Sequence, residues 1–136
     1  MTVDYIDVLF GRQSFKIPSR VKGSDGRFCM VEDQIGSGGN AVVCKCASER
    51  DGTIYAIKFL ASSKDANRLP RFLLETRIIE KLTAARHDHL VRFMASGVAK
   101  GFSFNRRRQR DVSVEMPFFI MERASKTLRE FLAATG

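Results

Sequence analysis

The residues of this chain with the clearest chemical potential are a cluster of glycines followed by a lysine. Three glycines fall within four positions, at Gly36, Gly38 and Gly39. A backbone without Cβ atoms can close around a phosphate and direct its N–H groups at the oxygens. Lys58, about twenty residues further on, supplies a cation that can neutralise phosphate charge. Together these residues outline a nucleotide-binding site.

Two expected strands would bring the lysine to the glycines. The segment from Ala41 to Ala47 is apolar and rich in β-branched residues, which favours a strand. Asp51-Gly52 is a strong tight-turn signal, so a second strand from Thr53 to Leu60 should return beside the first. Because side chains alternate along a strand, Ala56 and Lys58 should share one face under the glycine-rich segment.

A helix is expected from about Leu69 to about Ala85, because proline is tolerated in the first helical turn and Pro70 stands there. Helical spacing places one acid within an apolar stripe formed by Phe72, Glu75, Ile79 and Leu82. Burying that carboxylate alone is costly, so Glu75 requires a cation that reaches its face of the helix.

The glycine segment and the lysine strand resemble those of the eukaryotic-type protein kinases, of the serine/threonine kind. The family pattern G-x-G-x-x-G-x-V followed by V-A-I-K is matched by Gly36, Gly38, Ala41 and Val43, then by Tyr55-Ala56-Ile57-Lys58. Ala41 stands where the third glycine is usual, and Tyr55 where the first valine is usual.

Three further segments carry the same resemblance. Glu75 begins Glu-x-x-Ile-Ile-x-x-Leu, which is similar to the kinase helix whose glutamate pairs with the strand lysine. The residues from His87 to Val91 resemble the segment that follows that helix. Pro117 to Glu122 resembles the strand that runs into the kinase hinge. Thr127 to Glu130 is a capping box that should open a short helix after the hinge.

The resemblance implies an α+β fold: a kinase small lobe with a five-stranded antiparallel sheet and one main packed helix, at about 69–85. It divides the chain into an N-terminal extension at 1–27 that could form strands, a kinase-like ATP-binding lobe at 28–124, and the start of the post-hinge helix at 125–136. Gly101 to Val114 is expected to be a long basic connection between strands.

The implied ligand is ATP, with Lys58 on its α and β phosphates and Glu75 holding that lysine. Met121 would be the gatekeeper beside the adenine, and the carbonyl of Glu122 and the amide of Ala124 would bond the base. The full implied nucleotide set is Ile35, Gly36, Ser37, Gly38, Gly39, Val43, Ala56, Lys58, Met121, Glu122 and Ala124. Ordinary sheet packing accounts equally for the apolar members, and a Lys58–Glu75 ion pair can exist in a fold that binds no nucleotide.

The implied function is the ATP-binding region of a serine/threonine-type kinase that is inactive alone. The chain holds no His-Arg-Asp catalytic loop and no Asp-Phe-Gly, so Mg²⁺ binding and catalysis would need a large lobe that these residues do not supply. The alternative is a free-standing regulatory or pseudokinase-like module that acts through a partner protein, including self-association through an exposed lobe interface.

Composition sets the remaining expectations. The chain has 136 residues, a net charge of +8 and no apolar run of membrane-spanning length, so no membrane contact is expected. Its three cysteines, odd in number and without a pattern, fit a reducing compartment, which predicts a cytoplasmic protein. Cys29, Cys44 and Cys46 form no metal-binding pattern; core cysteines are the plainer interpretation, and no metal site is predicted. Much of the positive charge lies in the run from Arg106 to Arg110, with Phe102 and Phe104 nearby; as a solvated loop it gives little support to nucleic-acid binding, which we do not expect.

Overall fold

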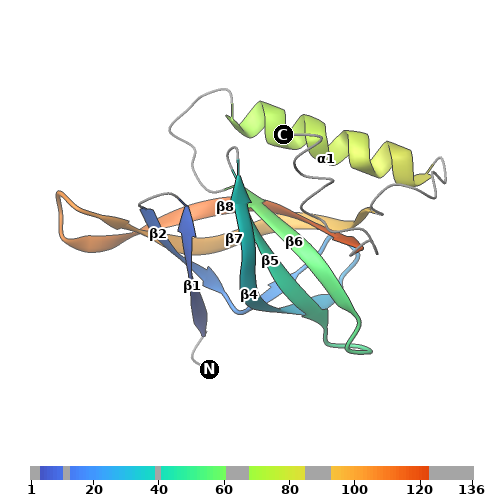
Figure 1. Cartoon of the computed structure of the whole chain (residues 1–136), viewed down its shortest axis with the longest axis horizontal. Helices are drawn as coiled ribbons and strands as arrows, with labels where there is room; N and C mark the ends of the chain where they lie inside the picture. The colour runs from blue at the N-terminus through green and yellow to red at the C-terminus, as the bar shows by residue number, and fades with distance from the viewer. Residues whose placement is uncertain (1–3, 11–12, 39–40, 61–67, 85–92, 123–136) are drawn as a thin grey trace.

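The computed structural model describes residues 4–10, 13–38, 41–60, 68–84 and 93–122 of the chain. In these ranges eight strands and one helix follow in the order shown in Figure 1. They are β1 Tyr5–Phe10, β2 Gln13–Pro18, β3 Arg20–Lys22, β4 Phe28–Gly38, β5 Ala41–Ser48, β6 Ile54–Leu60, α1 Arg68–Ala84, β7 Phe93–Asn105 and β8 Arg110–Glu122.

The strands form one antiparallel sheet in the order β1-β2-β7-β8-β6-β5-β4-β3. The predicted five-stranded kinase small lobe is therefore wrong, because the sheet has eight strands. The strands expected at 41–47, 53–60 and 117–122 are present in β5, β6 and β8, and these three strands are adjacent in the sheet. Three strands come from residues 5–22 and extend the sheet at both sides, since β1 and β2 join β7 while β3 joins β4.

The sheet curves into a half-barrel around a large apolar core. Residues from both ends of the sheet meet in this core, among them Val8 and Ile17 from β1 and β2 and Val31 and Cys46 from β4 and β5. Two hydrogen bonds from the Gln34 side chain stabilise the curved sheet. Gln34 accepts a hydrogen bond from the Leu9 amide at 2.9 Å and donates one to the Leu9 carbonyl at 2.7 Å. Strand β1 thus lies against β4, a strand far from it in the sheet order.

The opposite face of the sheet is covered by α1, which crosses it in Figure 1. Phe72 of α1 is 1% exposed and packs on Phe119 of β8 with ring centroids 5.4 Å apart. Ile79, two turns on, is also buried. The predicted helix is confirmed to within a residue at each end, and its predicted apolar stripe holds at Phe72 and Ile79. The Leu82 side chain lies outside the described part.

Strand β6 is buried on both sides, as its largely apolar sequence, interrupted only by Lys58, suggests. Ile57 and Phe59 point into the half-barrel core, whereas Ala56 and Leu60 belong to the second core under α1. Lys58 lies at the position between those two residues and so takes the α1 face. The predicted shared face of Ala56 and Lys58 is confirmed.

The segment from Gly101 to Val114 is not the long connection that was predicted. It is a continuous β-hairpin in which β7 and β8 pair in register from Ala95↔Ile120 to Asn105↔Arg110. Only residues 106–109 form the turn. Although its sequence is polar, this segment can form strands because its backbone N–H and C=O groups hydrogen-bond across the hairpin.

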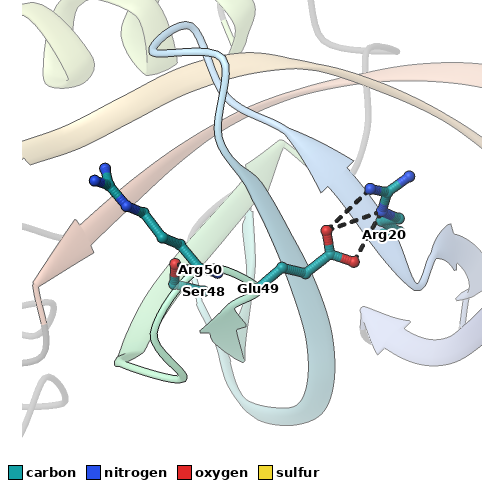
Figure 2. Close-up of polar contacts among 4 residues, drawn as sticks. All are labelled: Arg20, Ser48, Glu49 and Arg50. Atoms are coloured by element: carbon teal, nitrogen blue, oxygen red, sulfur yellow. Dashed lines mark hydrogen bonds and ion pairs between the residues drawn. The ribbon is translucent and has the colours of Figure 1, made fainter.

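A salt bridge ties the edge strand β3 to the β5–β6 turn (Figure 2). Arg20 donates from Nε to Glu49 Oε1 at 2.9 Å and from Nη2 to Oε2 at 3.0 Å, and its guanidinium stacks 3.7 Å from the centroid of the Phe28 ring. Next to Glu49, the Arg50 amide donates to Ser48 Oγ at 3.3 Å. These contacts order the turn from which β6, the lysine strand, begins.

Within the described residues, no helix is both long and apolar enough to cross a membrane.

Candidate functional site

Lys58 lies near the centre of the sheet on β6, the strand between β5 and β8. Its register partners are Val43 on one side and Phe119 on the other, and its Nζ lies 5.9 Å from the centroid of the Phe119 ring. The residue is only 8% exposed. An ammonium group with so little access to water requires a charged or strongly polar partner.

Glu75 of α1 provides that partner. Lys58 Nζ donates to Glu75 Oε1 at 2.6 Å, and the two side chains are 11% and 25% exposed. The helix can deliver the carboxylate because Phe72 and Ile79, three and four positions away on the same side, are buried against the sheet. The pairing that the resemblance implied is therefore present in the structure.

The apolar residues predicted to flank an adenine ring belong to one cluster beneath α1. Val43, Ala56 and Met121 are core members, and Ile35 packs on them from the edge. Ala56 and Met121 are register partners on β6 and β8 and have no exposed surface. Sheet packing alone explains those two positions, whereas the half-buried Ile35 is partly open to solvent.

The glycine-rich segment begins inside the β4–β5 hairpin, beside this cluster. Gly36 is the register partner of Val43, Ser37 of Val42, and Gly38 of Ala41. A Cβ added at Gly36 would meet nothing within 4 Å, so the space over the backbone there is open. Register shifts on either side of Gln34 show that the pairing of β4 with β5 is irregular just before the glycines.

The remaining predicted nucleotide contacts lie at the margin of the described structure. Glu122 ends β8, is exposed and pairs with Tyr55. Gly39 and Ala124 are outside the described residues, as are the predicted post-hinge helix and the segment that begins at His87. The structure therefore places Lys58 and Glu75 together and brings the first glycines close to the same cluster.

Sequence reasoning did not single out Phe119. The ammonium of Lys58 lies over the ring of Phe119, and Phe72, on the same helix as Glu75, packs against that ring. The signal was present, because alternation in the run Phe118 to Met121 puts Phe119 and Met121 on the face of Lys58. A cation beside an aromatic face gains electrostatic stabilisation in addition to its ion pair.

The three cysteines are buried in the half-barrel core on the far side of the sheet from Lys58. Burial raises the pKa of the Cys44 thiol from 9.0 to about 12, and burial likewise raises the pKa of Cys29 and Cys46. Thiols held in their protonated form are poor metal ligands. The structure thus agrees with core cysteines.

Comparison with known proteins gives a partial match to kinases. Over 69 residues the chain is 35% identical to the serine/threonine-protein kinase PknK of Mycobacterium tuberculosis, in two strains, and of Mycobacterium bovis. The match covers 51% of this chain and 6% of the relatives' length. No family model matches the chain. These matches support a relationship to serine/threonine kinases for about half of the chain.

Proposed function

We propose that this chain binds ATP as the nucleotide-binding region of a serine/threonine-kinase-related protein. The observation that carries the proposal is the Lys58–Glu75 pair, in which Nζ and Oε1 are 2.6 Å apart beside a glycine-rich strand end. The partial likeness to PknK, a serine/threonine-protein kinase by name, supports the same proposal. The eight-stranded sheet sets the fold apart from the small lobe first expected.

On this proposal each group has a defined task. Lys58 neutralises charge on the α and β phosphates, and Glu75 keeps its ammonium pointed at them rather than at solvent. The backbone amides of Gly36, Gly38 and Gly39 approach the phosphate oxygens, since these residues have no Cβ in the way. Ile35, which is partly open to solvent, offers apolar surface to the adenine, and the buried Val43 supports it from the core.

Phosphoryl transfer requires more than these groups supply. Among the described residues, no group of three or more His, Cys, Asp or Glu side chains could hold a metal ion, so we assign no magnesium ligand. No base for an acceptor hydroxyl is identified either. We therefore propose nucleotide binding for this chain. Any transfer of the phosphoryl group is assigned to a longer protein that contains the magnesium ligands and the base.

Ligand-observed NMR with the 136-residue chain and millimolar ATP tests the proposal. We expect a dissociation constant of about 1 mM or weaker, because half of the usual phosphate contacts are lacking. Lys58→Ala should abolish binding, whereas Lys22→Ala removes an equal charge from the exposed edge strand β3 and should leave it unchanged. Circular dichroism establishes that both variants are folded. Equal affinity of Lys58→Ala and the parent would refute the assignment.

A second candidate function is self-association as a regulatory module. It is favoured by the outer face of α1, where Leu69, Leu73, Leu74 and Ile78 are 40–59% exposed. Such a cluster of apolar side chains is unusual on a helix that faces only water. Light scattering decides the matter: a dimer that dissociates in Leu74→Lys supports it, and a monomer at high protein concentration removes it.

A further inference from the structure

The β7–β8 hairpin forms an arm that extends past the rest of the sheet. Neighbouring β2 pairs with β7 only at Phe15↔Ser103 and Lys16↔Phe102, and β6 pairs with β8 only from Phe118 onward. β7 continues for two residues past Ser103, whereas β8 from Arg110 to Pro117 pairs with β7 alone among the strands, and Asn105↔Arg110 is the last pair before the turn. In Figure 1 the arm is the orange hairpin that projects beyond β2. Its tip is thus presented away from the core.

The tip concentrates positive charge in an ordered turn. Asn105 Oδ1 accepts from the Arg108 amide at 3.1 Å, Gln109 takes a left-handed backbone with φ of 53°, and its Nε2 donates to the Arg106 carbonyl at 2.9 Å. The four exposed arginines carried by this turn are Arg106, Arg107, Arg108 and Arg110. Within the described part of the chain, none of them forms a salt bridge. Their mutual repulsion falls when an anion binds.

An aromatic surface adjoins the arginines on one face of the arm. Phe102 and Phe104 lie on the same side of β7 because they are two residues apart in the strand. Tyr5 of β1 packs edge-on against Phe102, with ring centroids 5.4 Å apart. Phe104 is 41% exposed and Tyr5 is 40% exposed. Lys16 of β2 is the register partner of Phe102, and Asp111 of β8 is the register partner of Phe104. These two charged side chains neutralise each other in an ion pair with an N–O distance of 3.4 Å. Exposed aromatic faces are therefore left beside a cluster of unpaired cations.

This combination matches the chemistry of single-stranded nucleic acid. Arginine guanidinium groups bind phosphate in bidentate fashion, and unstacked bases bind aromatic rings. An acidic peptide would use the charge but not the rings. Adding such a peptide as a further strand along β8 would also place it beside Asp111 and Glu115, both exposed.

We infer that the arm formed by β7 and β8 binds single-stranded nucleic acid, with phosphates on the arginines of the tip and a base stacked on Phe104. This inference is separate from the ATP proposal, since the arm shares no residue with the Lys58–Glu75 pair. It also corrects the expectation from sequence that the basic run is a solvated loop. The arginines project from a defined hairpin instead.

The test measures fluorescence anisotropy of a labelled 20-nucleotide oligothymidine with the full chain at several salt concentrations. The variant Arg107→Gln/Arg108→Gln should weaken binding on the order of tenfold at 0.1 M salt. It should also reduce the slope of log K against log salt by about 1.4, the contribution of two phosphate contacts. The matched control Arg50→Gln/Arg77→Gln removes two exposed charges elsewhere and should change neither quantity.

A third variant separates stacking from charge. Phe104→Ala should weaken oligothymidine binding about tenfold without changing the salt slope, and should have no effect on an abasic oligonucleotide of equal length. Equal losses in the tip and control pairs would overturn the inference, because net charge alone would then explain binding. Unchanged affinity in Phe104→Ala, or tighter binding of poly-glutamate than of oligothymidine, would also overturn it in favour of a general or protein polyanion.

Discussion

Lys58 Nζ and Glu75 Oε1 lie 2.6 Å apart, which links the central strand β6 to the only helix in the described part of the chain. The two residues are 17 positions apart in sequence. Both side chains are largely shielded from water, with the lysine more so than the glutamate. The pair thus has a structural consequence as well as a proposed role in nucleotide binding, and the two can be measured separately.

The first prediction concerns the stability that this pair provides. Glu75→Gln should lower the free energy of unfolding by about 1–3 kcal/mol, because it leaves a shielded ammonium without its counter-charge. Lys58→Met should cost about 1 kcal/mol, since the more exposed carboxylate can turn toward water. Urea denaturation of the parent, both single variants and the double variant gives the coupling energy. Effects that simply add, within about 0.3 kcal/mol, would show that the two side chains do not interact in solution.

A second prediction contrasts two glycines. A Cβ at Gly101 would collide with the carbonyl oxygen of Lys16, a backbone atom of the neighbouring strand β2. Gly101→Ala should therefore destabilise the protein by about 1–3 kcal/mol. Gly36→Ala should change stability by less than about 0.5 kcal/mol, because a Cβ there meets nothing within 4 Å. Similar melting temperatures for the two variants would contradict the close approach of β2 to β7.

A third prediction is a pH dependence from the β5–β6 turn. The Thr53 amide donates to Asp51 Oδ1 at 3.0 Å, and this hydrogen bond lowers the pKa of Asp51 below its ordinary value of 3.8. The stabilisation is present above pH 3.8 and is lost as the pH falls through the lower pKa of the folded state. Asp51→Asn should destabilise the protein at pH 6, and this difference should shrink below pH 4. A difference between the two proteins that stays constant down to pH 2.5 would exclude the effect.

The cysteines give a fourth prediction. With the pKa of Cys44 raised by burial to about 12 from 9.0, its thiolate fraction at pH 8 falls on the order of a thousandfold. Cys29 and Cys46 are buried beside it and have pKa values shifted in the same direction. We expect slow reaction of all three thiols with a disulfide reagent in the native protein and rapid reaction in urea. Rapid modification of the native chain would contradict the placement of these cysteines in the core.

Much of the central sheet and the helix could be predicted from the sequence, because their residues follow simple periodicities. The turn at Asp51-Gly52 and the early proline of α1 fixed two boundaries closely. Burial of an acid in an apolar stripe predicted that Glu75 needs a cation, whereas the choice of Lys58 as that cation came from the resemblance to kinases.

The part of the β7–β8 hairpin from Gly101 to Val114 was missed because its alternation is inverted. In the last five residues of β7 the buried positions are the small residues Gly101 and Ser103, whereas the aromatic Phe104 is exposed. The polar and basic residues of this segment therefore predicted a connection between strands instead of a hairpin. The three strands at 5–22 were not counted in the predicted sheet because their attachment depends on distant partners, such as Ser103 for Phe15, which no local pattern reveals.

The central claim is that ATP binds beside Lys58, and a ¹⁵N-labelled NMR titration of the chain with ATP tests it most directly. We expect the largest amide shift changes at Gly36 to Val43 and at Phe119 to Glu122, with a common dissociation constant of about 1 mM or weaker. Shift changes confined to Asn105 to Arg110, with none at the glycine segment, would contradict the claim and show that ATP is held only as an anion by the arginine turn.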